Sequence, residues 1–259
     1  MRAVRPYHDE VRPSGDELPA VVLLDLDDTI VSFSVGKRNF WEDAYQRHAP
    51  ATLSITLQAF AEAIASASTE YWSEPLRAHR GRLDLRKARH QVALLALKRL
   101  SIEAGPWAQA LADCFTELKE AAVAPFPGAV AALEELRSRG VRLGLVTNGS
   151  SEFQRRKLRD HGLERFFETI MIEGELGIGK PSPEAFERAL AALDARPEDA
   201  WMVGDNLEAD IAGANALGIY AVWHNPMGID VPSASPGRPD RVIAHLRELI
   251  APRLASVPG

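Results

Sequence analysis

Five short apolar runs, separated by helical patterns, constrain the fold of this 259-residue chain more than any other feature. None of the runs alternates cleanly between polar and apolar residues, which is typical of strands that helices cover on both faces. Strands that alternate with helices predict an α/β fold with a mostly parallel sheet. The predicted strands are Ala20–Leu26, Val141–Thr147, Thr169–Glu173, Ala200–Gly204 and Tyr220–His224.

Helical patterns lie before and after the second predicted strand and continue toward the C-terminus. Two of them end at a glycine, as helices often do. A stretch rich in proline, serine and glycine, Met227–Pro239, predicts a surface loop before a last amphipathic helix. The predicted helices of this part of the chain are Ala129–Arg139, Glu152–His161, Pro183–Leu193, Leu207–Leu217 and Asp240–Leu249.

The interval between the first two predicted strands is much longer than a connection requires. It runs from Thr29 to about Pro127, whereas a crossover needs only about a dozen residues. Its helical patterns cover Asn39–His48, Leu53–Trp72, Leu85–Leu100 and Trp107–Ala122, and its aromatic residues are expected to form a core of their own. We therefore expect a lead-in over 1–18, a core over 19–34 and 125–259, and an inserted helical subdomain over 35–124, with hinges at Ser32–Gly36 and Ala124–Gly128.

The composition excludes several classes of protein. A formal net charge of −6 argues against a nucleic-acid binder, which usually carries a concentrated basic face. The single cysteine, Cys114, cannot form an intramolecular disulfide and fits a reducing compartment. No apolar run approaches the roughly 18 residues that a membrane span needs. We expect a cytoplasmic protein that is a monomer or a homodimer and has no membrane partner.

Carboxylates follow the first and the fourth predicted strands. Asp25 and Asp27 stand at alternate positions where the first strand ends, Asp205 ends the fourth strand, and Asp210 follows five residues later. Ligands of open α/β sheets bind outside the carboxyl ends of the strands, so these acids are expected in one crevice. Crowded carboxylates need a cation or a proton, and carboxylate oxygens suit Mg²⁺. An aspartate-rich capping loop, with Asp210 as a first-turn acid of a helix, remains the alternative.

Two further strand ends carry groups that could bind an anion. Thr147, Asn148 and Gly149 end the second strand just before a helix, where a hydroxyl, backbone amides and the helix dipole favour an anion; asparagine and serine are also ordinary helix caps. The segment Gly174–Ser182 almost matches a nucleotide-binding P-loop, but its proline stands where Ser or Thr would bind magnesium, so we reject an ATPase. What remains is Lys180 on a glycine-containing loop at a strand end.

Taken in order, these motifs resemble the haloacid dehalogenase superfamily, in its phosphatase branch and its subgroup with a helical cap after the first strand. The resemblance covers Ala20 to about Asn225. It implies a Rossmann-like core with a five-stranded parallel sheet of order 5-4-1-2-3. It also implies an aspartyl-phosphate mechanism: Asp25 as nucleophile, Asp27 as general acid and base, phosphate held by Thr147, Asn148 and Lys180, Mg²⁺ held by Asp25, the backbone carbonyl of Asp27 and Asp205, and Asp210 in support.

By this resemblance the chain is expected to be a Mg²⁺-dependent phosphomonoester hydrolase for a small phosphorylated metabolite, such as a sugar phosphate or a nucleotide. The dehalogenases of the superfamily lack an acid at the position of Asp27, which argues against that activity. A phosphomutase of the same fold stays open, and a phospho-accepting signalling domain is a weaker alternative because such domains are about half this length. Several basic residues of the insertion could meet a second anionic group or form a solvated face: Lys37, Arg38, Arg80, Arg82, Arg86 and Arg89.

Overall fold

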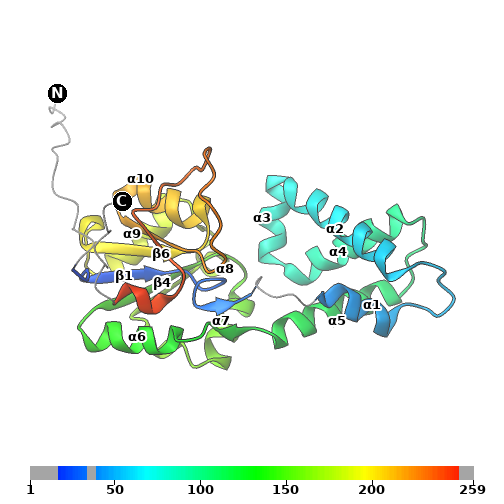
Figure 1. The fold of residues 1–259 in the computed structure, drawn as a ribbon, viewed down its shortest axis with the longest axis horizontal. Helices are drawn as coiled ribbons and strands as arrows, with labels where there is room; N and C mark the ends of the chain where they lie inside the picture. The colour runs from blue at the N-terminus through cyan, green and yellow to red at the C-terminus, as the bar shows by residue number, and fades with distance from the viewer. Residues whose placement is uncertain (1–16, 34–38, 251–259) are drawn as a thin grey trace, which may run out of the picture.

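The computed structural model of the protein describes residues 17–33 and 39–250. One lobe, on the left in Figure 1, contains a six-stranded sheet flanked by helices. Every strand pair of this sheet is parallel, and the strand order is β5-β4-β1-β6-β7-β8. Most of the expected lead-in, part of the first hinge, and the basic residues at 37 and 38 lie outside the described residues. The strands are β1 Val21–Leu24, β4 Arg142–Thr147, β5 Thr169–Ile172, β6 Ala200–Gly204, β7 Tyr220–His224 and β8 Arg241–Ile243.

The predicted α/β class and the relative order of the five predicted strands are confirmed, but the strand count is too low by one. The missed strand, β8, pairs with β7 at the edge of the sheet. It replaces the first half of the helix predicted over Asp240–Leu249, a prediction that is wrong; only a 3₁₀ turn, Leu246–Leu249, follows it. Asp240 sets the pairing, because its backbone N–H and its side chain both bond to the backbone of Ala221, each at 2.8 Å.

Helices cover both faces of the sheet, which explains why its strands lack alternation. In β1, Val22 and Leu24 belong to one apolar cluster, whereas Val21 and Leu23 belong to a second cluster on the opposite face. All four side chains are at most 1% exposed, and burial of each such side chain contributes about 1.5–3 kcal/mol. The helices around the sheet are α6 Ala129–Ser138, α7 Ser151–Asp160, α8 Glu173–Leu176, α9 Pro183–Ala192 and α10 Gly213–Leu217, with 3₁₀ turns at Glu164–Phe166 and Pro197–Asp199 and a π-helical turn at Leu207–Ala212 before α10.

A helical insertion stands beside this core, between the two-residue strands β2, Val31–Ser32, and β3, Ala124–Pro125 (Figure 1). These two strands pair antiparallel, so the chain leaves and re-enters the core at neighbouring points. The insertion has its own apolar cluster, and its aromatic residues stack within it, as predicted. The exact division into subdomains stays a prediction. The helices of the insertion are α1 Phe40–His48, α2 Leu57–Ser73, α3 Pro75–Leu83, α4 Leu85–Arg99 and α5 Trp107–Ala121.

Helix α3 has no counterpart among the predicted helices. Pro75 occupies its first turn, where the missing N–H leaves no bond unmade. The Glu74 side chain caps the helix by accepting hydrogen bonds from the backbone N–H groups of Leu76 and Arg77, at 2.9 and 2.8 Å. Gly81 packs so closely against Trp72 that an added Cβ would lie 2.9 Å from the indole ring. The proline therefore begins this helix, and the glycine allows it to pack against Trp72.

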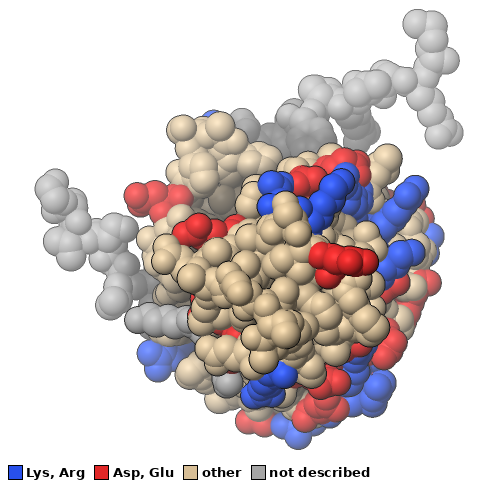
Figure 2. Space-filling view, turned by 90° about the vertical axis from the view of Figure 1, so that its right-hand side faces the viewer, with Lys and Arg blue, Asp and Glu red and all other residues tan. Residues whose placement is uncertain are grey.

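The end of the molecule formed by the insertion carries charges of both signs. In Figure 2, Lys and Arg side chains lie beside Asp and Glu side chains around a broad area that carries neither, and the described residues of this face form no continuous basic surface. The prediction that the chain has no nucleic-acid partner stays a prediction. Among the described residues, no helix combines the length and the hydropathy needed to cross a membrane.

Candidate active site

The carboxyl ends of three neighbouring strands, together with the loop between α8 and α9 that carries Lys180, bring the predicted site residues together. Strand β1 lies between β4 and β6, and the backbone N–H of Asp25 donates to Val203 O on β6 at 2.9 Å. A cavity of about 470 Å³ opens at this edge, a size suited to a small molecule. Every residue predicted for the site lines this cavity: Asp25, Asp27, Thr147, Asn148, Lys180, Asp205 and Asp210.

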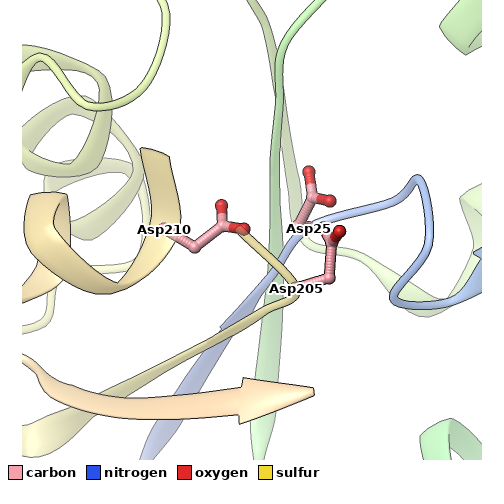
Figure 3. A group of neighbouring side chains, drawn as sticks. All are labelled: Asp25, Asp205 and Asp210. Atoms are coloured by element: carbon pink, nitrogen blue, oxygen red, sulfur yellow. The ribbon is translucent and has the colours of Figure 1, made fainter. Parts of the chain in front are cut away.

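Three aspartates form the acidic centre of the cavity. Figure 3 shows Asp25 and Asp205 side by side at neighbouring strand ends, with Asp210 pointing toward them from the helical turn after β6. Each offers a carboxylate oxygen within 4.8 Å of the other two. Gly204 makes this approach possible, since a Cβ there would lie 2.2 Å from Cγ of Asp210. Trp223 fixes the backbone beside the centre, because its indole N–H donates to the carbonyl of Asp205 at 2.7 Å.

Burial makes this acidic centre costly to ionise. It raises the pKa of Asp25 to about 7, although the ammonium of Lys180 opposes the shift. Burial, together with the charges of Asp25 and Asp210, raises the pKa of Asp205 to about 8. Crowded carboxylates with raised pKa values need a cation to ionise together, and hard oxygen ligands are those that magnesium prefers. The donor set and its electrostatics therefore fit a divalent cation.

Lys180 supplies the positive charge beside this centre. Its Nζ lies 2.5 Å from Oδ1 of Asp25 and 2.6 Å from Oδ1 of Asp210, and the residue is only 5% exposed. Burial alone would lower the pKa of Lys180, but the two carboxylates raise it above its ordinary value. The lysine therefore stays charged and contacts Asp210 as well as Asp25, and the supporting role of Asp210 stays a prediction.

Asn148 holds Lys180 in place through the lysine's backbone. The Asn148 Oδ1 accepts from the Lys180 backbone N–H at 2.8 Å, and its Nδ2 donates to the Lys180 carbonyl at 2.7 Å. Gly179 permits this contact, since a Cβ there would lie 2.7 Å from Asn148 Oδ1. Asn148 was predicted to bind phosphate with Thr147 and Lys180. It lines the cavity, but its side-chain amide is bonded to this loop.

Asp27 is held by two residues that belong to none of the sequence motifs, Gln154 and Lys157 of α7. Lys157 Nζ lies 2.6 and 2.7 Å from the two carboxylate oxygens of Asp27, and Gln154 Nε2 donates to one of them at 3.0 Å. Both residues lie on the buried side of α7, between Phe153 and Leu158. A glutamine and a lysine three residues apart usually mark a solvated helix face. One sequence signal could have identified them. Both stand on the apolar side of a helix that directly follows a strand end with predicted site residues.

Comparisons with known proteins identify the family of the chain. Residues 19–218 match the model of the haloacid dehalogenase-like hydrolase family. The chain is 35% identical to a phosphoserine phosphatase of Thermus thermophilus, over 88% of this chain and 97% of that protein. It is 32% identical to a glyceraldehyde 3-phosphate phosphatase of Pyrococcus furiosus, over 78% of this chain and 79% of that protein.

A solved structure of the same fold is that of the HAD-hydrolase YfnB from Bacillus subtilis bound to magnesium. It superposes with a TM-score of 0.67 at 25% identity and covers 90% of this chain and 97% of that one. The predicted resemblance to the superfamily and to its phosphatase branch is thus confirmed. The chain belongs to the haloacid dehalogenase-like hydrolase family, as a phosphatase that acts on a small phosphorylated substrate.

Proposed function

We propose that this phosphatase is Mg²⁺-dependent and works through an aspartyl phosphate on Asp25. The observation that carries the proposal is a buried Asp25 that contacts the Lys180 ammonium and lies beside the acids Asp205 and Asp210 in one cavity. Covalent catalysis of this kind divides one difficult hydrolysis into two easier steps. Asp25, Asp205 and the backbone carbonyl of Asp27 would hold the ion, with Asp210 in support. When bound, the ion supplies positive charge that neutralises the carboxylates and the phosphoryl oxygens.

Asp27, Lys180 and Thr147 act in both half-reactions. In the first, a carboxylate oxygen of Asp25 bonds to phosphorus as the ester P–O bond breaks, and Asp27 gives its proton to the departing alcohol. In the second, water attacks the phosphorus, Asp27 takes a proton from that water, and the bond to Asp25 breaks to release phosphate. Lys180 and the Thr147 hydroxyl hold the phosphoryl oxygens during both steps, so the protein mainly positions groups and neutralises charge.

The test of this proposal is chemical trapping of the intermediate. The full chain is mixed with Mg²⁺ and p-nitrophenyl phosphate, quenched in acid within the first turnover, and digested for mass spectrometry. We expect phosphate on the peptide that contains Asp25. A fast phosphatase whose quenched Asp25 peptide never carries phosphate, even when the quench time is shortened, would contradict the covalent mechanism.

The substrate is proposed to be a small phosphorylated metabolite of the size that the cavity accepts. The two relatives act, by name, on phosphoserine and glyceraldehyde 3-phosphate, which are both small phosphomonoesters. A panel of these two compounds, hexose phosphates and nucleoside monophosphates measures the preference directly. We expect the smaller esters to give the higher kcat/KM values. The cytoplasmic location and the monomeric or homodimeric state stay predictions.

Arg82 of α3 is expected to contribute to substrate binding from the insertion. It lines the same cavity, and its buried Nε has no hydrogen-bond partner among the described residues. Replacing Arg82 by alanine is expected to raise KM about tenfold, since a charge-assisted hydrogen bond contributes about 1.5–3 kcal/mol. Arg80→Ala, at an exposed position of the same helix, is the matched control and should leave KM nearly unchanged. Equal KM values for the two variants would remove Arg82 from the binding site.

The raised pKa values predict that Mg²⁺ stabilises the fold more at high pH than at low pH. Without the ion, folded Asp25 and Asp205 keep protons up to about pH 7 and 8, whereas unfolded aspartates lose theirs near pH 4. The stability contributed by these groups is therefore full below about pH 4 and is lost as the pH rises through 7 to 8. Mg²⁺ relieves this repulsion but has to displace the protons at low pH.

The measurement is the shift in melting temperature on adding Mg²⁺ at about pH 5.5 and at about pH 8. We expect a clearly larger increase at pH 8 for the unaltered chain, and little increase at either pH for Asp205→Asn. The same increase at both pH values in the unaltered chain would show that the ion does not compete with protons at these carboxylates.

A further inference from the structure

A buried amide and a buried ammonium on α7 contact the proposed acid–base residue directly. We propose that Lys157 and Gln154 are positioning residues, which hold the Asp27 carboxylate for proton transfer and fix it relative to the Thr147 hydroxyl. The inference rests on the proposed role of Asp27 as general acid and base, and it adds two residues of α7 to that function.

The contacts of Lys157 leave its ammonium group fully engaged. Its three N–H donors are matched by three oxygens: Oδ1 of Asp27 at 2.6 Å, Oδ2 of Asp27 at 2.7 Å and Oε1 of Gln154 at 2.8 Å. The Phe33 ring covers the ammonium with its centroid 4.1 Å away. The Lys157 side chain is only 7% exposed, so solvent and salt screen this pair far less than they screen a surface ion pair. The lysine therefore restricts both oxygens of Asp27 to one orientation.

Gln154 connects this ion pair to the predicted phosphate-binding strand end. Its Nε2 shares two N–H donors among three acceptors, Thr147 Oγ1 at 2.7 Å, the Asn148 carbonyl at 2.8 Å and Asp27 Oδ2 at 3.0 Å. Because the Thr147 oxygen accepts from this amide, the hydroxyl proton is directed elsewhere, and its contact with the Asn148 carbonyl is a long 3.5 Å. That proton is therefore available to a phosphoryl oxygen. One glutamine thus sets the position of Asp27 and orients the Thr147 hydroxyl.

A role confined to folding does not account for this arrangement. The buried side of α7 packs on the core through Leu158, and apolar residues at 154 and 157 would be buried there at lower cost. Asp27 lines the cavity and its side chain is 26% exposed, so it does not need a buried lysine to satisfy its charge. The burial of Lys157 is therefore explained by its contact with the Asp27 carboxylate, which lines the cavity.

Dependence of the rate on the leaving group separates positioning from folding. p-Nitrophenolate leaves without needing a proton, whereas the alkoxide of glycerol 3-phosphate needs one from the general acid. We compare alcohol release in the first turnover, because hydrolysis of the phosphoenzyme is common to both substrates. Lys157→Met is expected to slow release of glycerol by about tenfold to a hundredfold and release of p-nitrophenol by less than about threefold. Gln154→Met should show the same selectivity with a smaller loss.

Two controls accompany these variants. Lys119→Met removes a second lysine that lies over the same Phe33 ring, at 4.5 Å. Its charge acts on Asp27 from a distance, but it has no hydrogen bond to Asp27 among the described contacts, so its loss should give much less selectivity between the substrates than Lys157→Met. Lys157→Arg keeps the charge and should recover part of the selective loss. Equal slowing of both substrates by Lys157→Met would mean that Lys157 supports only the fold. Faster release of glycerol would mean that the ion pair with Lys157 hinders proton donation by Asp27. Either outcome overturns the proposal.

Asp27→Asn is measured in parallel, because it separates the positioning role of Lys157 from the acid–base role of Asp27. If Asp27→Asn shows the selective loss and Lys157→Met does not, positioning by Lys157 is wrong while the acid–base role of Asp27 stands. If Asp27→Asn itself treats the two substrates alike, the acid–base assignment is wrong and the inference falls with it.

Discussion

Replacing Asp25 by asparagine is expected to reduce phosphate release by on the order of 10⁴-fold or more, because an amide cannot form the covalent intermediate. Asp25 is 6% exposed and packed against Lys180, so a near-isosteric amide should fit without rearranging the strand end. Its raised pKa shows that burial makes the charged form costly. The metal-free variant should therefore be at least as stable as the parent near pH 8, where the parent carries that charge.

Activity and stability are measured on the same preparations. Steady-state release of phosphate from p-nitrophenyl phosphate gives the loss, and thermal melting in EDTA gives the stability. Asp230→Asn makes the same chemical change at an exposed position and should alter neither quantity. If Asp25→Asn retained most of the parent's rate, Asp25 would not be the nucleophile. If the rate fell together with a large drop in melting temperature, the loss could not be assigned to chemistry.

Sequence reasoning predicts the parts of this fold that depend on local pattern. The buried strands were identified because their apolar runs are continuous, and the acids at their ends because parallel strands end at one edge of the sheet. It fails for β8, whose three residues join the sheet through the contact of Asp240 with Ala221. Asp240 and Ala221 are 19 residues apart, so a local periodicity cannot reveal their contact. In this short segment, pairing with β7 outweighs the helical pattern of the sequence.

The same distinction applies to the candidate site. Asp25, Lys180, Asp205 and Asp210 stand in short motifs whose spacing indicates their chemistry, and the structure places them around one cavity. The roles of Lys157 and Asn148 depend instead on which partners the fold brings to them, an active-site carboxylate for one and a loop backbone for the other. A lysine on a helix usually extends its ammonium group into solvent. Only the burial of that helix face reveals the partner.

Lys180→Met is expected to have the second largest effect, on activity and stability together. The ammonium lies between Asp25 and Asp210, and its removal leaves two buried carboxylates without their cation. Breaking one side of a buried ion pair costs about 3–5 kcal/mol. Loss of the lysine also raises the pKa of Asp25 above its present value of about 7, because Lys180 is the group that lowers it. Without the ion, Asp25 would then be protonated at neutral pH, and Mg²⁺ would have to displace that proton before Asp25 could attack phosphorus.

The expected result is a loss of phosphate release of about 10²–10³-fold at pH 7, the scale seen when one transition-state donor is removed. Part of the loss should be recovered as the pH rises, since a higher pKa moves ionisation of Asp25 to higher pH. The pH profile of kcat/KM measures this shift, with Lys98→Met at an exposed position of α4 as the control. Lys180→Arg should lie between the two, because a guanidinium keeps the charge but not the compact geometry. If the acidic side of the kcat/KM profile stays at the same pH in Lys180→Met, the lysine acts on the phosphoryl group alone and does not set the ionisation of Asp25.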